Sequence, residues 1–139
     1  MGTVTRPELS GKNPYWVERH RYYELKHFCM QYPIWKKAYA ALEGLSRSNI
    51  DAVIVSRTGE TSDPTAKCAE AREFYEQRIA LVEGAAKDTD PVIGGYILTA
   101  VVEGLSYDRL RLVEGIPCGK EVYYTLYRRF FWLLDRRRG

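Results

Sequence analysis

The sequence predicts an all-α fold, a compact multi-helix domain with a C-terminal helix-turn-helix. The first observation behind this prediction is a set of Asn-Pro and Asp-Pro pairs that open segments with helical apolar spacing, at Asn13-Pro14, Asp63-Pro64 and Asp90-Pro91. Such a pair is typical of a helix start. Its Asn or Asp side chain can accept free backbone N–H groups of the first turn, and proline has no N–H to leave unpaired there.

The second observation is the position of glycines after periodic segments, where a residue without Cβ can adopt the left-handed conformation that ends a helix. These glycines are Gly44, Gly104 and Gly115. The third observation is that few segments have the residue pattern of a β-strand. The β-branched run at 52–55 is too short to be distinguished from a helical turn by periodicity, so the structure of residues 45–62 stays open, with a loop expected at 57–62.

Four helices are predicted before residue 104. Their ranges are 14–31, which breaks before Pro33, then 34–43, then 64 to between 83 and 87, and finally 91–103. Aromatic side chains of the first two helices are candidates for the core, because such side chains dominate core packing. A surface shared with the neighbouring basic residues is the alternative. The core candidates are Trp16, Tyr23, Phe28 and Trp35.

The composition is that of one ordinary globular domain, with 139 residues of which 45% are hydrophobic and 28% charged. No apolar run approaches the roughly 20 residues needed to cross a bilayer, and residues 1–13 lack the apolar segment of a secretory signal. A cytoplasmic location in a bacterial host, without membrane contact, is therefore expected. Cys29, Cys68 and Cys118 have no metal-binding spacing and cannot all pair, which predicts reduced thiols, no metal site and no cofactor.

Charge is unevenly distributed along the chain. Residues 1–47 carry 8 Lys or Arg against 4 Asp or Glu, residues 48–104 carry 5 against 10, and residues 105–139 carry 8 against 4. The basic ends indicate a surface for a polyanion, and solvated helix faces are the alternative interpretation.

Residues 104–139 have the layout of a DNA-reading segment. Ser106 can cap a helix over 107–114, Gly115 can end it, residues 116–117 can form a turn, and a last helix can run from 118 or 119 to about 136. Two helices joined by a short glycine-containing turn form a helix-turn-helix, whose second helix lies in the DNA major groove. The expected division is a flexible N-terminus at 1–12, a helical part at 13–103 and this segment, packed as one domain.

The last helix has two expected faces. The apolar stripe at helical spacing consists of Val122, Leu126, Phe130 and Leu133. The cationic face consists of Lys120, Tyr124 and Arg128, with Thr125, Arg129 and Arg136 in the neighbouring row. Base edges would be met by Lys120, Glu121, Tyr124 and Thr125, and phosphates by Arg128 and Arg129, with nonspecific attraction from residues 136–138. Generic helix packing and a protein-partner surface are the alternatives, because basic residues near a helix C-terminus also complement the macrodipole.

Two segments carry a resemblance to a known family. They are residues 103–107 continuing through IPCGKEVYYTLYRRFFWLL at 116–134, and KNPYW at 12–16 with YYELKHFCMQYPIWKK at 22–37. The first resembles the C-terminal region of phage and prophage regulators of the ArpU/RinA type, whose reader is similar to the region 4 helix-turn-helix of sigma factors. The second resembles the start of phage-encoded proteins from Gram-positive hosts. The resemblance implies activation of late phage genes, or control of packaging and lysis genes. Gly119 departs from the family pattern, which usually has a polar cap there.

The sequence contains few candidates for catalytic or metal-binding residues. His20, Glu24 and His27 could share a helix face as metal ligands, but the surrounding basic residues favour a solvated or anion-facing surface. No phosphate-binding glycine loop or nucleophile motif is present in the sequence, so the protein is not expected to be an enzyme.

Three functional hypotheses follow from the sequence. The first is a phage regulator that binds double-stranded DNA, as a homodimer or with host RNA polymerase, because a single reader makes few base contacts. The second is a DNA-packaging protein like a terminase small subunit. The third is a phage-encoded inhibitor of a host nucleic-acid machine, an anti-defence protein that docks on another host protein.

Overall fold

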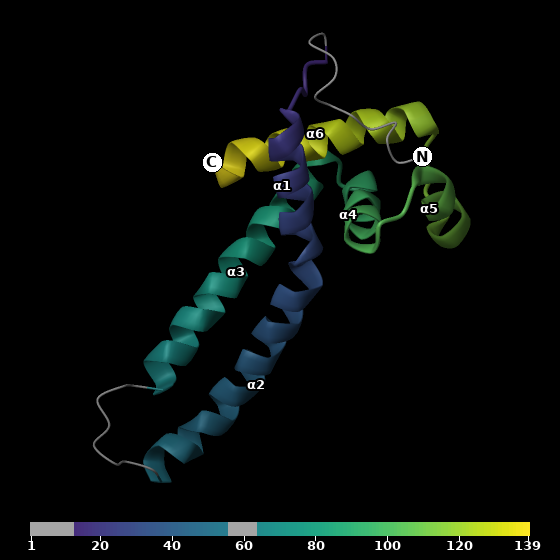
Figure 1. Ribbon diagram of the computed structural model, residues 1–139. Coiled ribbons are helices and arrows are strands. Elements are labelled where there is room, and N and C mark those ends of the chain that lie inside the picture. Colours follow the sequence, from purple (N-terminus) through teal and green to yellow (C-terminus); the bar gives the residue numbers. More distant parts are fainter. Residues whose placement is uncertain (1–12, 56–63) are drawn as a thin grey trace. The chain divides into compact units, whose positions relative to one another are not determined.

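The computed structural model describes residues 13–55 and 64–139, and it is all-helical over these ranges (Figure 1). The six described helices are α1 (Arg19–Met30), α2 (Tyr32–Val55), α3 (Pro64–Thr89), α4 (Ile93–Glu103), α5 (Tyr107–Glu114) and α6 (Lys120–Arg138). The all-α prediction is confirmed. Within the described ranges, no helix is both long enough and apolar enough to span a membrane.

The chain divides into two compact units, which cut across the expected division at residue 103. The first unit contains residues 13–32 and 81–139 of the described chain, and the second contains residues 33–80, of which 56–63 are not described. The C-terminal residues 104–139 thus share one unit with α1, α4 and the end of α3.

The core of the first unit lies among three helices. Helices α1, α4 and α6 pack against one another, and α5 packs against α4. Figure 1 shows α1 crossing α6. The largest fully buried side chains of this core are Tyr123, Phe130, Phe131, Leu25, Ile97, Leu110, Leu134, Val82 and Cys29. Of the aromatic core candidates in this unit, Phe28 is buried, whereas Trp16 and Tyr23 are 46% and 44% exposed and are therefore corrected to surface positions.

Helix α1 begins later than predicted. The Asn13 side chain accepts a hydrogen bond from the Tyr15 N–H at 2.9 Å, and the Trp16 N–H donates to the Asn13 carbonyl, so Asn13-Pro14 forms a closed turn instead of a helix start. The cap is Glu18, whose carboxylate accepts the N–H groups of His20 and Arg21. These backbone hydrogen bonds, that from His20 first, lower the pKa of Glu18.

In the second unit, α2 is longer than predicted. It begins at Tyr32, so Pro33 lies in its first turn, where a missing N–H leaves no hydrogen bond unmade. The helix continues past Gly44 to Val55, which corrects the predicted end at 43. The predicted loop at 57–62 lies outside the described residues.

Helices α2 and α3 lie side by side within the second unit (Figure 1). The Cys68 thiol donates to the Leu42 carbonyl, and the Arg72 guanidinium lies 3.5 Å from the Glu43 carboxylate. Helix α3 begins at Pro64 as predicted. The capping role predicted for Asp63 falls on a residue that the structure does not describe.

The last three helices begin and end close to their predicted boundaries. The Asp90 carboxylate accepts the N–H groups of Val92 and Ile93, both at 2.8 Å, and these bonds lower its pKa. The Ser106 hydroxyl accepts the Arg109 N–H at the start of α5. Gly104 and Gly115 adopt φ of 69° and 67° at the ends of α4 and α5. Gly119 precedes α6 without a side-chain cap.

Candidate nucleic-acid interface

Helix α6 buries a different side from the one predicted. Its buried side chains are Tyr123, Tyr124, Tyr127, Phe130, Phe131 and Leu134. Of the predicted apolar stripe only Phe130 is buried, while Leu126 and Leu133 are half-buried and Val122 is 54% exposed. The prediction was wrong because it built the stripe on Val122, Leu126 and Leu133 and placed Tyr124 on the outer face, although a tyrosine ring buries more apolar surface than a valine.

Several tyrosine hydroxyls that pack at this side find partners within the protein, whereas the buried hydroxyl of Tyr123 has none in the described part of the chain. The hydroxyls of Tyr22 and Tyr127 share a hydrogen bond of 3.0 Å. The Tyr124 hydroxyl accepts the Tyr107 N–H at 3.3 Å, and the Tyr107 hydroxyl donates to the Cys118 carbonyl at 2.5 Å. These bonds tie the start of α5 to the segment before α6. They also offset the desolvation cost of placing polar groups in a core.

Tyr124 is therefore removed from the candidate interface. It is 7% exposed, its ring packs against Tyr123 with centroids 4.9 Å apart, and its hydroxyl is used inside the unit. A side chain covered in this way cannot reach a base edge. The predicted cationic face of Lys120, Tyr124 and Arg128 consequently does not exist as one open row.

The remaining predicted residues divide by exposure. Lys120, Glu121 and Thr125 are exposed on the first two turns of α6. Arg128 and Arg129 are half-buried, and Arg136 is exposed. At 100° per residue the outward side of α6 is centred on Thr125 and Arg136, in the row that the sequence placed beside the main face.

The outward side of α6 is partly covered toward its C-terminal end. The Tyr15 ring packs against Trp132 with centroids 5.5 Å apart, and the Arg136 guanidinium lies 4.7 Å from the centroid of Trp132. Arg129 donates to the Asp88 carbonyl at 3.2 Å. The open part of this side is consequently its N-terminal half, around Glu121, Val122 and Thr125.

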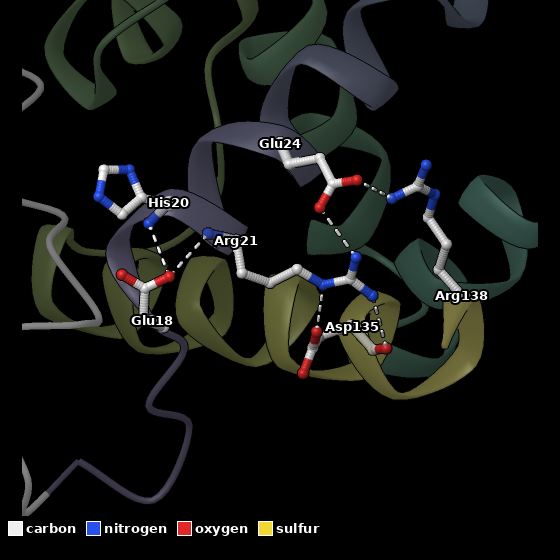
Figure 2. Close-up of polar contacts among 6 residues, drawn as sticks. All are labelled: Glu18, His20, Arg21, Glu24, Asp135 and Arg138. Atoms are coloured by element: carbon white, nitrogen blue, oxygen red, sulfur yellow. Dashed lines mark hydrogen bonds and ion pairs between the residues drawn. The ribbon is translucent and has the colours of Figure 1, made fainter.

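Ion pairs engage two of the three arginines at the C-terminal end (Figure 2). Arg138 donates to the Glu24 carboxylate at 3.0 Å, and Arg21 donates to the same carboxylate at 2.9 Å and to Asp135 at 2.6 Å. Arg137 pairs with Asp88. Residues 136–138 were predicted to attract DNA nonspecifically. The carboxylates of Glu24 and Asp88 partly neutralise their positive charge, which weakens their attraction for a polyanion.

The same ion pairs engage Glu24, which the sequence analysis considered as a metal ligand together with His20 and His27. The Glu24 carboxylate is held by Arg21 and Arg138, and the pKa of Glu24 is lowered by hydrogen bonds from Arg138 first and then Arg21. Figure 2 shows the His20 ring lying apart from this carboxylate. No group of three or more His, Cys, Asp or Glu side chains within residues 13–55 and 64–139 is arranged to hold a metal ion.

Exposed apolar side chains near the α5–α6 turn were missed by the sequence reasoning. Leu112 and Val113 on α5 are 82% and 61% exposed, and Val122 follows on α6. The signal was available for Leu112 and Val113, because the helical positions that pack α5, Tyr107 and Leu110, leave both of them on the outside.

Comparisons with protein-family models, with curated proteins and with solved structures find no match to this chain.

Proposed function

We propose that this protein binds double-stranded DNA through the N-terminal half of α6 and acts as a phage-type transcriptional regulator. The observation that carries the proposal is the exposure of Lys120, Glu121 and Thr125 on the first turns of α6, directly after a short turn from α5. Helices α5 and α6 both pack against α4. Such an arrangement is consistent with a helix-turn-helix on a supporting helix.

The roles of the residues follow from their exposure. Lys120, Glu121 and Thr125 are the candidates for base edges, since donors and acceptors on the first turns of a recognition helix enter the major groove. Arg128, half-buried beside them, is the candidate for a phosphate contact. Arg136 would add a more distant phosphate contact. Arg129 already donates to a backbone carbonyl, so it is a weaker candidate than the sequence suggested.

The proposed interface has few residues that could contact bases, which limits the sequence specificity of a single copy of the protein. Useful specificity therefore requires a homodimer on paired half-sites or a contact to RNA polymerase.

A mobility-shift series tests the DNA proposal. We expect Lys120→Ala and Arg128→Ala each to weaken retention of a selected operator, with Lys120→Ala costing about 1–3 kcal/mol if it reads a base. Arg128→Ala should also reduce the slope of log affinity against log salt by about 1, because it removes one phosphate contact. Lys87→Ala removes an equal charge from an exposed position at the end of α3 and is the matched control.

Three outcomes would change the interpretation. Equal retention by the wild-type protein and by the Lys120→Ala and Arg128→Ala variants would refute the placement on α6. Retention that is indifferent to sequence, by a ring-shaped oligomer, would favour a packaging role. No retention at any salt concentration would exclude the DNA proposal.

A protein-partner function is the second candidate, and the exposed Leu112, Val113 and Val122 favour it. Leu112 and Val113 are neighbours on α5, and large apolar side chains exposed next to each other are typical of a docking site. Purified bacterial RNA polymerase is the first partner to test, because a regulator and an inhibitor of transcription would both touch it. We expect Leu112→Ser with Val113→Ser to abolish co-elution, and Val92→Ser, at a position 60% exposed at the start of α4, to leave it unchanged.

A further inference from the structure

The C-terminal half of α6 carries arginines in two different settings. Arg137 and Arg138 pair with carboxylates, and Asp135 on the same helix accepts from Arg21 of α1. Three other arginines of this helix form no ion pair with any residue within 13–55 and 64–139, namely Arg128, Arg129 and Arg136. Positive charge is therefore left unbalanced along one part of α6.

Trp132 lies between two of these arginines on the outward side of α6. Positions 129, 132 and 136 have the i, i+3, i+7 spacing that places side chains on one side of a helix. The Arg136 guanidinium lies over the Trp132 ring, 4.7 Å from its centroid. The Tyr15 ring packs against Trp132 with centroids 5.5 Å apart, and the Arg129 guanidinium lies 6.0 Å from the centroid of Tyr15. We call Tyr15, Arg129, Trp132 and Arg136 the arginine–tryptophan cluster.

Arg136 is the most exposed member of this cluster, since the other three are half-buried. Its guanidinium makes no hydrogen bond to a residue of the described ranges, so its five N–H donors remain available. A planar guanidinium held over an indole ring is already ordered, which reduces the conformational entropy lost when a ligand packs on its outer face. Arg136 thus presents a flat cationic face together with unused donors.

A cationic plane backed by a ring matches the chemistry of unpaired nucleotides. A base outside a duplex exposes a flat π face, which can stack on aromatic rings or on guanidinium planes. The phosphates beside that base need cations, which Arg129 and Arg136 supply from either side of Trp132. A duplex offers phosphates but keeps its bases stacked on one another, so it would make no use of the plane over Trp132. The combination therefore favours a single strand.

We propose that the arginine–tryptophan cluster binds single-stranded nucleic acid. An unpaired base stacks on the Arg136 guanidinium, which Trp132 supports from behind, and a neighbouring phosphate meets Arg129. The cluster lies in the C-terminal half of α6, apart from the candidate base contacts of the N-terminal half. Trp132 has no part in the proposed duplex contact, so a failure of duplex binding would leave this proposal standing.

Fluorescence anisotropy with labelled strands of about ten nucleotides tests the proposal on the full chain. We expect oligothymidylate or oligouridylate to bind at least about tenfold more tightly than an abasic strand of equal length, which has phosphates but no bases. The tighter of the two base-carrying strands identifies the preferred sugar. Trp132→Leu keeps an apolar side chain but removes the ring, and should weaken binding of that strand by about tenfold. Arg136→Lys keeps the charge but removes the planar guanidinium, and should weaken it by a similar factor.

Controls separate stacking from charge and from folding. Trp132→Leu should bind the abasic strand as the wild-type protein does, because both arginines of the cluster remain. Arg111→Lys, at an exposed position on α5, is the matched control for Arg136→Lys and should leave all affinities unchanged. Arg136→Lys alters an exposed side chain, so it decides the question even if Trp132→Leu loses stability. The proposal is overturned if no strand binds, if the abasic strand binds as tightly as the others, or if Arg136→Lys keeps wild-type affinity.

Discussion

Gly94, in the first turn of α4, lies directly against the backbone near the end of α3. A Cβ added there would lie 1.9 Å from the carbonyl oxygen of Ala86 and 2.6 Å from its carbonyl carbon. Both contacts are with main chain, which cannot rotate away as a flexible side chain could. The close approach of α4 to α3 in this unit therefore depends on the absence of a single methyl group.

We expect Gly94→Ala to lower the free energy of unfolding by about 1–3 kcal/mol or more, which is the usual effect of overpacking a core. Urea denaturation followed by circular dichroism measures it. Gly95→Ala is the matched control, because an added Cβ there meets nothing within 4 Å. That control should gain about 0.5–1 kcal/mol from reduced backbone freedom. Equal stability of the two variants would show that the close contact at Gly94 is absent in solution.

The cysteines illustrate a residue-scale prediction that held. Cys29, Cys68 and Cys118 are all free thiols, as their spacing predicted. Burial raises the pKa of Cys29 to about 12, so almost none of it is thiolate at neutral pH. Burial, and to a lesser degree the nearby Asp90 charge, also raises the pKa of Cys118. Both shifts disfavour the thiolate, which is the nucleophilic form of cysteine.

At the scale of elements, α1 and α6 are joined by polar contacts as well as by their core. Arg21 of α1 bridges Glu24 and Asp135, and Arg138 returns from the end of α6 to Glu24 (Figure 2). The aromatic contact between Tyr22 and Phe131, with centroids 5.0 Å apart, lies on the same pair of helices. Glu24 is the point at which two arginines from different helices meet.

Acid should weaken this junction in a defined direction. Since the folded protein lowers the pKa of Glu24, the ionised carboxylate stabilises the fold above its ordinary pKa of 4.5, and this stabilisation is lost as the pH falls below that value. We expect Glu24→Gln to lower the urea midpoint at pH 7, and the difference from wild type to shrink between pH 4.5 and pH 3. Glu76→Gln, at an exposed position on α3, is the control. A difference that is constant across this range would exclude the arginine contacts as its cause.

At the scale of the whole molecule, the first unit is assembled from two separate stretches of chain. Its core side chains come from residues 17–29, 82–101, 107–116 and 123–134, and the chain between 33 and 80 forms the second unit. The Tyr32 hydroxyl donates to the Glu83 carboxylate, which brings the two ends of the interruption together. Along the chain, the second unit is therefore an insertion between the two stretches of the first.

We expect the first unit to fold after residues 33–80 are replaced by a Gly/Ser linker of roughly six to ten residues, which can span this short distance. The shortened chain should keep a cooperative thermal transition and the chemical shifts of the α6 tyrosines. A Tyr32→Phe version tests whether the contact to Glu83 contributes to closure. Loss of the cooperative transition in the shortened chain would show that the first unit needs residues 33–80 to fold.

Local chemistry determined much of the fold from the sequence alone. Asp90, Ser106, Gly104 and Gly115 mark helix boundaries because each acts on backbone groups within a few residues of itself, so neighbouring sequence is sufficient information. Asn13 and Gly44 show the limit of this rule. A local turn replaced the helix at Asn13, and a longer helix continued through Gly44.

The sequence by itself determined that the chain is helical and approximately where its last three helices begin and end. Only the tertiary structure decided which side of α6 is buried, because a tyrosine suits either a core or a surface until partners for its hydroxyl are known. It also decided that Arg138 and Glu24, 114 residues apart, form an ion pair. Such contacts depend on how the helices pack, and packing depends on all the side chains of a unit together. The spacing of residues along one helix does not contain this information.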